Sequence, residues 1–374
     1  MLQRLYIHNF RCLENFELSI KGMSSALLIG KNGAGKSTIA IALEVLQKIS
    51  RGINRMRELE NLNLISPKYF ARGRSDVPIR FEIEVLLDDK LYKYVLALEL
   101  PEKFKELRVF EEQLLVSGDP IYSRKEAQVT LHNSSQNREA QFLVDWHLVA
   151  LPIIQEQSET DPLRIFKTWL GRTIILSPIP TLMTGESNGE TLEPKPDGSN
   201  FGEWISGLLS RYPAAYTQVD KYLREIMPDI QDFLNEQIGK DSKNMIVRFE
   251  ANKTNLSIDF KDLSDGEKCF FLCAVVLAAN KFYGPLFCFW DEPDNYLSLS
   301  EVGHFVTSLR RSFKDSGQIL VTSHNPEAIL KFSDENTFVL HRKNHLEPTL
   351  IRLLGDISVQ GDLVDALIRG DIEI

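Results

Sequence analysis

The sequence predicts an α/β protein with a mixed sheet, an antiparallel β subdomain and an inserted helical lobe. Three observations lead to this fold class. An apolar run at 27–29 enters a glycine-rich turn and then a helical pattern. Two further apolar runs, 286–290 and 318–322, are typical of buried parallel strands and end in polar residues. Short alternating segments separated by turn residues fill 79–131, which predicts an antiparallel meander.

The glycine-rich turn reads G-x-x-x-x-G-K-S over residues 30–37, which is the spacing of a phosphate-binding P-loop. Backbone N–H groups in such a loop point at phosphate oxygens, and the following helix presents its positive end to the same charge. We expect Lys36 to reach the β- and γ-phosphates, Ser37 to hold Mg²⁺ and Thr38 to lie by the α-phosphate. The predicted nucleotide-binding residues of the loop are Asn32, Gly33, Gly35, Lys36, Ser37 and Thr38.

The composition is that of a globular protein and argues against several classes. Of the 374 residues, 43% are hydrophobic and 25% are charged. No apolar run approaches the roughly 20 residues that cross a bilayer, so we expect a cytoplasmic protein without membrane association. The net charge of −9 opposes a wholly electrostatic coat on nucleic acid. The four cysteines lack paired C-x-x-C spacing, and we expect them to be buried packing residues and not zinc ligands.

Residues 2–20 alternate apolar and polar side chains around a turn at 9–11, which predicts a β-hairpin. Arg11 in that turn either leans over nucleotide phosphates or is an ordinary solvated arginine. A basic stretch follows the first predicted helix and includes Arg55, Arg57, Arg72 and Arg74. This stretch is either a solvated loop or a contact for DNA or RNA.

The middle of the chain after the meander reads as a mixture of helices and strands. Helical spacing is present at 138–154, 162–170 and 201–238, a strand-like run at 173–176, and a hairpin pattern at 244–260. Residues 181–200 carry Gly, Ser, Pro, Thr and Glu with few apolar residues, which predicts a mobile surface loop. No long heptad array is present before residue 260.

Three further positions along the chain predict chemistry. Ser264 and Gly266 open an apolar helix and can present a hydroxyl and N–H groups to an anion, although Ser264 with Glu267 also fits an ordinary capping box. Asp291 and Glu292 end a buried strand, where Asp291 would organise Mg²⁺ and Glu292 would polarise the attacking water. His324 follows the next apolar strand, where it could sense a γ-phosphate.

These motifs together resemble the ABC-type ATPase heads of the RecF, SMC and OLD-like group, which belong to the AAA-family ATPases of bacterial DNA repair and anti-phage defence. The resemblance covers the chain to about residue 50 and again over 255–345. In this comparison 30–37 is the Walker A motif, 263–267 the signature loop, 291–292 the Walker B end and His324 the switch histidine. The turn at 9–11 also matches, which implies that Arg11 contacts the nucleotide.

The resemblance implies ATP and Mg²⁺ as cofactors and a head-to-head dimer or higher oligomer. Ser264 and Gly266 of one subunit would close over the γ-phosphate held by Lys36 of the other. Ser298 departs from the pattern, because many relatives have aspartate there. The predicted core spans 1–50 and 255–350, the inserted lobe 51–254, and a tail helix 351–374 that would dock a partner or pack on its own head.

The lengths of the chain segments distinguish among the members of this group. The chain lacks the heptads of SMC arms, and too few residues follow the last predicted strand for the nuclease domain of OLD-type enzymes. We therefore expect an ATP-hydrolysing switch that senses or loads onto nucleic acid and controls a separate effector protein, as in anti-phage defence. The alternatives are a RecF-like DNA repair ATPase and a scaffold in which ATP locks the assembly with little turnover.

Overall fold

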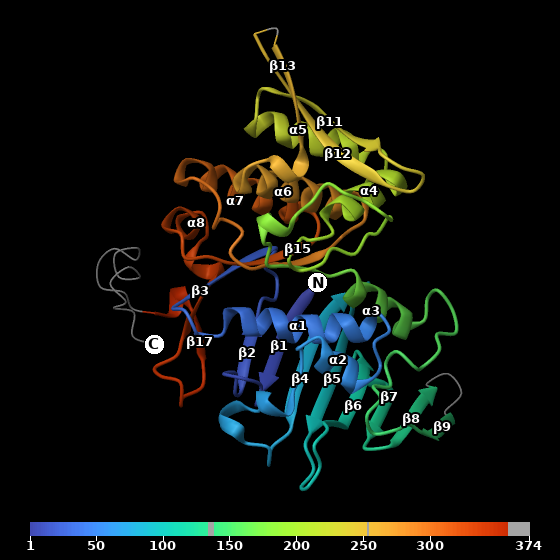
Figure 1. Cartoon of the computed structure of the whole chain (residues 1–374). Coiled ribbons are helices and arrows are strands. Elements are labelled where there is room, and N and C mark those ends of the chain that lie inside the picture. The colour runs from blue at the N-terminus through green and yellow to red at the C-terminus, as the bar shows by residue number, and fades with distance from the viewer. Residues whose placement is uncertain (134–137, 253, 358–374) are drawn as a thin grey trace. The chain divides into compact units, whose positions relative to one another are not determined.

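The computed structural model describes residues 1–133, 138–252 and 254–357. The chain forms two compact units, which are drawn in Figure 1. Among the described residues, unit 1 comprises those within 1–23, 28–173 and 334–357, and unit 2 those within 24–27 and 174–333. Strand β3 (Ser25–Gly30) therefore begins in unit 2 and ends in unit 1.

Unit 1 contains an eight-stranded antiparallel sheet in the order β2-β1-β4-β5-β6-β7-β8-β9 (Figure 1). A row of directly opposed residues crosses five of these strands and is fully buried: Leu5, Ile83, Tyr94, Leu114 and Tyr122. The alternating sequence pattern thus places one face in the core, and the predicted hairpin and meander are confirmed. The strands are β1 (Leu2–His8), β2 (Phe16–Ser19), β4 (Ile79–Leu87), β5 (Lys90–Glu99), β6 (Arg108–Val116), β7 (Asp119–Lys125), β8 (Gln128–Asn133) and β9 (Arg138–Leu143).

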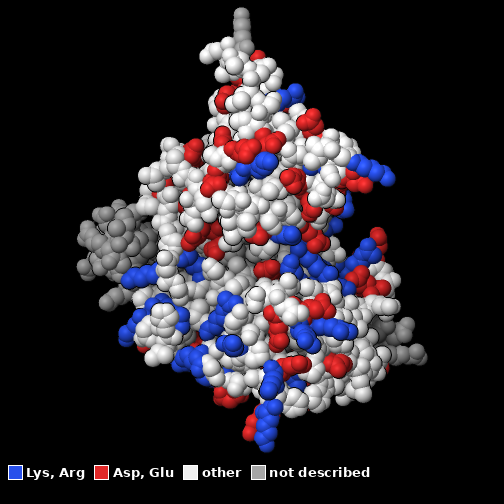
Figure 2. Space-filling view, viewed as in Figure 1, with Lys and Arg blue, Asp and Glu red and all other residues white. Residues whose placement is uncertain are grey.

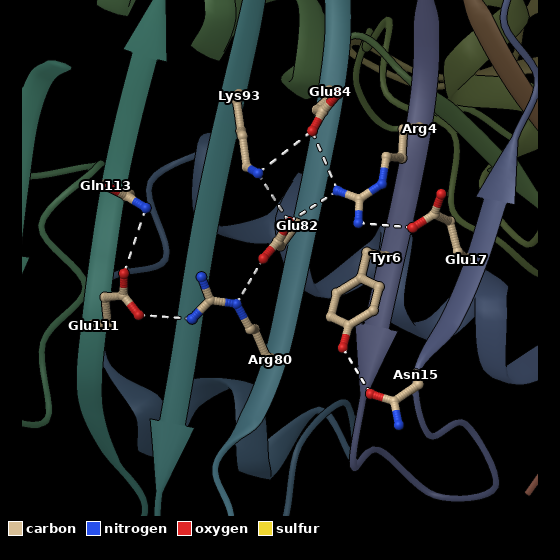
Figure 3. Close-up of polar contacts among 10 residues, drawn as sticks. All are labelled: Arg4, Tyr6, Asn15, Glu17, Arg80, Glu82, Glu84, Lys93, Glu111 and Gln113. Atoms are coloured by element: carbon tan, nitrogen blue, oxygen red, sulfur yellow. Dashed lines mark hydrogen bonds and ion pairs between the residues drawn. The ribbon is translucent and has the colours of Figure 1, made fainter. Parts of the chain in front are cut away.

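The other face of this sheet carries a network of ion pairs, which Figure 3 shows in close-up. Glu82 of β4 lies at its centre and has a side chain that is only 9% exposed. Its carboxylate accepts from Arg80 Nε at 2.7 Å and from Arg4 Nη1 at 2.9 Å, and Lys93 Nζ lies 3.1 Å away. Burial opposes ionisation of this carboxyl, but hydrogen bonds from Arg80, Arg4 and Lys93 lower the pKa of Glu82 to about 2.

Two helices of unit 1, α1 (Lys36–Ser50) and α3 (Pro162–Gly171), lie against each other. Gln47 Nε2 donates to the Thr173 carbonyl at 2.5 Å, and Arg51 Nε donates to the Gly171 carbonyl at 2.8 Å. Both bonds join the end of α1 to the end of α3. The remaining elements of unit 1 are α2 (Met56–Asn61) and the antiparallel pair β16 (Thr337–His341) and β17 (Leu350–Leu353).

Unit 2 contains three parallel strands, β10 (Ile174–Leu176), β14 (Phe287–Trp290) and β15 (Gln318–Thr322), with β14 between the other two. All residues of β14 and β15 are buried, which explains why β14 and the central residues of β15, 319–321, are apolar. The Ile319 N–H donates to the Ser24 carbonyl at 2.9 Å, so the chain entering β3 lies beside β15. The helices α6 (Asp265–Phe282), α7 (Leu299–Asp315) and α8 (Pro326–Leu330) complete this part of unit 2.

The rest of unit 2 consists of α4 (Phe201–Arg211), α5 (Ala215–Ile226) and an antiparallel sheet. This sheet contains β11 (Ile230–Gln237), β12 (Lys243–Ala251) and β13 (Thr254–Asp259), and its β12–β13 end extends away from α6 and α7 (Figure 1). Phe233 of β11 packs edge-on against Phe271 of α6, with ring centroids 5.8 Å apart. Units 1 and 2 thus contain both parallel and antiparallel sheets with helices, as the predicted fold class requires.

Two helix predictions were wrong in part. Residues 138–143 form strand β9, which pairs with β8, and not the start of a helix. The chain after β9 is irregular because buried Glu112 accepts hydrogen bonds from the Ala150 N–H at 2.7 Å and the Leu151 N–H at 2.8 Å. Residues 230–237 form β11 because β12 offers a pairing edge, whereas 201–211 and 215–226 are helical as predicted.

The predicted surface loop at 181–200 is irregular but largely packed. Met183, Ser187 and Leu192 are buried. Two glycines of α4 allow this, because a Cβ at Gly202 would lie 2.3 Å from the Glu186 carbonyl oxygen and a Cβ at Gly207 would lie 2.2 Å from that of Thr191. The loop therefore lies directly on the α4 backbone, which its polar composition did not reveal.

Other expectations concern the cysteines, the membrane and the tail. Cys269, Cys273 and Cys288 are buried as predicted, and burial raises the pKa of the Cys269 thiol to about 12. Cys12 is only partly buried, so the prediction was wrong for that residue. The described residues contain no cluster of His, Cys, Asp and Glu suited to a metal ion. Over the same ranges no helix has the length and apolar character of a membrane span. In the predicted tail helix at 351–374, residues 351–353 instead belong to β17 and 354–356 form a short 3-10 helix, and 358–374 lies outside the described residues.

Candidate functional site: a phosphate loop and a carboxylate edge

The phosphate loop in unit 1 connects β3 to α1 and depends on its glycines. Gly30, Gly33 and Gly35 have φ of +154°, +80° and +101°. A Cβ at Gly30 would lie 2.4 Å from the Leu340 carbonyl oxygen, and one at Gly35 would lie 2.9 Å from Cys12 Sγ. The backbone conformation and the close approach of neighbouring segments therefore both require glycine at these two positions.

The loop is arranged to accept an anion. Within the described residues the N–H groups of Asn32, Gly33 and Gly35 form no backbone hydrogen bond, whereas the Ala34 N–H donates to the Lys31 carbonyl at 3.1 Å. Asn32 and Gly33 are exposed. Lys36 is buried, and its Nζ donates to the Gly30 carbonyl at 2.8 Å, which folds the ammonium group back over the loop. Unengaged N–H groups at a helix start, next to an ammonium group, suit phosphate oxygens.

Arg11 is not a freely solvated arginine. It has φ of +55°, and its N–H donates to the Tyr69 carbonyl at 2.6 Å. The guanidinium carbon lies 4.0 Å from the centre of the Tyr69 ring, and Nε is buried without a hydrogen-bond partner. Asn9 anchors the same turn, because its Nδ2 donates to the Val77 carbonyl at 2.6 Å. The stacking of Arg11 on Tyr69 leaves its charge with hydrogen-bonding capacity for an anion.

The carboxylate edge in unit 2 lies where β14 ends. The Asp291 N–H donates to the Leu176 carbonyl at 2.7 Å, so the chain remains registered with β10 as it leaves the sheet. Thr322, the last residue of β15, donates its hydroxyl to Asp291 Oδ1 at 2.6 Å. The Glu292 N–H donates to the same Thr322 Oγ1 at 2.9 Å. Glu292 has φ of +47°, an uncommon conformation for a residue of this size.

The Glu292 carboxylate is held by two neighbours. Asn295 Nδ2 donates to Glu292 Oε2 at 2.6 Å. His324 Nε2 lies 3.4 Å from Glu292 Oε1, and these side chains are 42% and 31% exposed. The structure thus brings together the two residues predicted to be general base and phosphate sensor, at the distance of an ion pair.

A buried hydrogen-bonded pair of residues follows the carboxylate edge in the chain. Ser323 Oγ donates to Asp294 Oδ2 at 2.7 Å, and both residues are buried. Burial raises the pKa of the Asp294 carboxyl. No motif in the sequence pointed to Thr322, Ser323, Asp294 or Asn295. Only their position in the sequence could have identified them, because all four flank predicted site residues after β14 or at the end of β15.

The signature loop has the capping-box structure that its sequence allowed. The Glu267 carboxylate accepts from the Ser264 N–H at 2.8 Å and from Ser264 Oγ at 2.7 Å. Ser264 is exposed at the start of α6. A Cβ at Gly266 would lie 3.0 Å from the Tyr296 carbonyl oxygen, so the segment after Glu292 approaches this helix closely.

Ser298, which departs from the family pattern, has a local structural role. The Glu301 carboxylate accepts from the Ser298 N–H at 2.9 Å and from its hydroxyl at 2.6 Å. Ser298 therefore caps α7. An aspartate here could still cap the helix but would repel Glu301.

The predicted basic residues differ in how they are engaged. Arg72 and Arg74 both bind Glu14, at 2.6 and 3.1 Å. Arg55 and Arg57 line a pocket of about 370 Å³ together with three acidic residues, Glu60, Glu106 and Asp145. Figure 2 shows lysine and arginine interspersed with acidic side chains over the face that it displays. Each pair of arginines thus lies beside carboxylates.

Solved structures of other proteins show which fold this chain has. The fold is that of SMC-type ATPase heads. A structure titled as the SmcHead bound to the C-winged helix domain of ScpA matches with a TM-score of 0.54 and 15% identity, covering 95% of this chain and 98% of that one. An Smc head with an extended coiled coil, bound to the C-terminal domain of ScpA derived from Pyrococcus furiosus, matches with a TM-score of 0.54 and 13% identity, covering 95% and 96%.

A match to a family model shows the family to which the chain belongs. The family model described as "AAA domain, putative AbiEii toxin, Type IV TA system" matches residues 25–330. The chain belongs to this AAA-domain family and has the fold of SMC ATPase heads. No curated protein sequence matches the chain.

Proposed function

We propose that the protein is a molecular switch that binds and hydrolyses ATP with Mg²⁺ and changes its assembly state as it does so. The observation that carries this proposal is the phosphate loop, with its unengaged N–H groups and the Lys36 ammonium folded over it. Membership of an AAA-domain ATPase family supports the choice of ATP. Bound Mg²⁺ would neutralise phosphate charge and help to activate the γ-phosphate for attack by water.

The site residues have separate roles in this proposal. Lys36 binds the β- and γ-phosphates, Ser37 and Asp291 hold Mg²⁺, and Glu292 takes a proton from the attacking water. His324 contacts the γ-phosphate and, through its neighbour Glu292, links phosphate binding to the base. The order of these residues along the chain, which is that of the family, supports assigning them to one nucleotide.

Arg11, Asn32, Gly33, Gly35 and Thr38 are proposed to bind the rest of the nucleotide. The stacked Arg11 guanidinium and the loop N–H groups support this assignment. The 3.7 Å contact between Thr38 Oγ1 and Cys12 Sγ fixes the threonine at the start of α1.

We propose that ATP drives head-to-head association, with Ser264 and Gly266 of one subunit closing over the γ-phosphate bound to another. The exposed Ser264 hydroxyl at the start of α6 supports this role, because it lies beside the N–H groups of a helix start. The capping bond to Glu267 would then exchange for a bond to phosphate.

The test is the mass of the Glu292→Gln protein in solution, with and without ATP and Mg²⁺. We expect a nucleotide-dependent shift to a dimer or larger assembly, because ATP remains bound when the base is removed. Lys36→Ala is the matched control and should remain in its nucleotide-free state. A Glu292→Gln protein that hydrolyses ATP at the wild-type rate would show that another group is the base.

We further propose that the ATP-bound assembly senses nucleic acid and controls a separate effector protein in anti-phage defence. The alternatives are a RecF-like repair ATPase and a scaffold that ATP locks with little turnover. Steady-state hydrolysis with and without DNA separates a stimulated switch from a scaffold. Charge reversal at Arg55 and Arg57, compared with the same change at Arg72 and Arg74, tests which pair contacts DNA or RNA. A contacting pair should weaken binding and flatten its salt dependence.

A further inference from the structure

One side chain of unit 2 touches both residues of the carboxylate edge. Thr322 is fully buried at the end of β15, and its neighbour Val321 is paired with Trp290 of β14. The Thr322 hydroxyl donates to Asp291 Oδ1 at 2.6 Å and accepts the Glu292 N–H at 2.9 Å. A single oxygen on the adjacent strand therefore links the two consecutive acidic residues.

The direction of these two bonds is fixed by the chemistry of the groups. A backbone N–H can only donate, so the Thr322 oxygen must be the acceptor from Glu292. The only hydroxyl proton is then directed to Asp291, whose ionised carboxylate is an acceptor. Because Thr322 is buried, water cannot replace either bond without entering the strand pair.

The same oxygen also stabilises an unusual backbone. Glu292 has φ of +47°, and the Asn295 N–H donates to the Glu292 carbonyl at 3.3 Å, which closes a tight turn. The hydrogen bond to Thr322 Oγ1 holds the backbone N–H of the same residue, Glu292. The Glu292 carboxylate then lies against Asn295 and His324, whereas the Asp291 carboxylate faces Thr322.

We propose that Thr322 is a positioning residue that orients Asp291 for Mg²⁺ and fixes the backbone from which Glu292 acts. This inference rests on the proposed function of the two carboxylates. Groups that hydrogen-bond to metal-binding carboxylates fix their orientation, and their loss typically costs about 10- to 100-fold in metal affinity or activity.

The experiment compares Thr322→Val with Thr322→Ser. Valine keeps the shape of the side chain but leaves Asp291 Oδ1 and the Glu292 N–H without this partner, whereas serine keeps the hydroxyl. We expect Thr322→Val to lower kcat by about 10- to 100-fold and to raise KM because nucleotide affinity in Mg²⁺ falls, and Thr322→Ser to restore most of the activity.

A second readout does not depend on turnover. Calorimetry with a non-hydrolysable ATP analogue should show that Thr322→Val loses about tenfold or more of the gain in affinity that Mg²⁺ provides. Affinity in EDTA should be unchanged, because the phosphate loop is intact. Thermal unfolding of the nucleotide-free variants reports any general loss of structure, which would lower affinity with and without Mg²⁺ alike.

The outcomes separate this inference from the proposed function. If Thr322→Val has the kcat and the Mg²⁺ dependence of the wild-type protein, the proposed role of Thr322 is wrong. The role is also wrong if Thr322→Ser loses as much activity as Thr322→Val. If Glu292→Gln hydrolyses ATP normally, the base assignment fails, but the Mg²⁺ dependence of nucleotide binding still decides the role of Thr322. A wild-type protein whose nucleotide binding ignores Mg²⁺ would overturn both.

Discussion

Replacing Glu82 by Gln should destabilise unit 1 far more than replacing Glu17 by Gln. Both carboxylates pair with Arg4, at 2.9 and 2.8 Å, but their side chains are 9% and 52% exposed. Glu82 also pairs with Arg80 and Lys93. The two variants therefore compare the same chemical change at a buried centre and at an exposed rim of one network (Figure 3).

The magnitude follows from the pKa of Glu82, which is lowered from 4.5 to about 2. A difference of this size corresponds to about 3 kcal/mol of stabilisation of the ionised form. The side chains of Arg4, Arg80 and Lys93 are 24–35% exposed, and solvent screening reduces the expected loss to about 2 kcal/mol. The exposed pair of Glu17 should contribute no more than about 1 kcal/mol.

The loss should depend on pH in a defined direction. Because the folded-state pKa is below the unfolded value of 4.5, the stabilisation is fully present above that value and is lost as pH falls toward about 2. Urea unfolding should therefore show a constant deficit for Glu82→Gln between about pH 7 and 6, narrowing below about pH 4. Equal losses in the two variants, or a deficit that persists in acid, would refute the assigned network.

Three further changes test other parts of the structure. Gly35→Ala should weaken ATP binding about tenfold or more in calorimetry, because its Cβ would meet Cys12 Sγ at 2.9 Å; unchanged affinity would contradict the loop geometry. Gly207→Ala should cost about 1–3 kcal/mol in urea unfolding, because its Cβ would meet the Thr191 carbonyl at 2.2 Å, and should expose 183–200 to protease. Glu112→Gln should cost about 3–5 kcal/mol, because it leaves buried Arg124 without its carboxylate; wild-type stability would show that the pair is dispensable.

Local patterns predicted the elements that carry the candidate site. The strand before the phosphate loop and the helix after it needed only an apolar run and helical spacing. The polar residues after β14 and β15 followed from the apolar runs at 286–290 and 319–321. Strand β9 was predicted to be helical because only its residues 139–142 alternate between polar and apolar, and its state is decided by pairing with β8. The packing of the loop at 181–200 was not predicted because it depends in part on glycines in a later helix, which its own polar composition does not reveal.

The sequence by itself determined the phosphate loop, the order of the motifs and the class of fold, because these depend on residues close together in the chain. Only the tertiary structure decided which distant groups meet. Thr322 reaches Asp291 because β14 and β15 are adjacent. The Glu82 carboxylate forms ion pairs with basic side chains of β1, β4 and β5. Hydrogen bonds and ion pairs act only over a few ångströms, so their partners are set by how strands align in space and not by spacing along the chain.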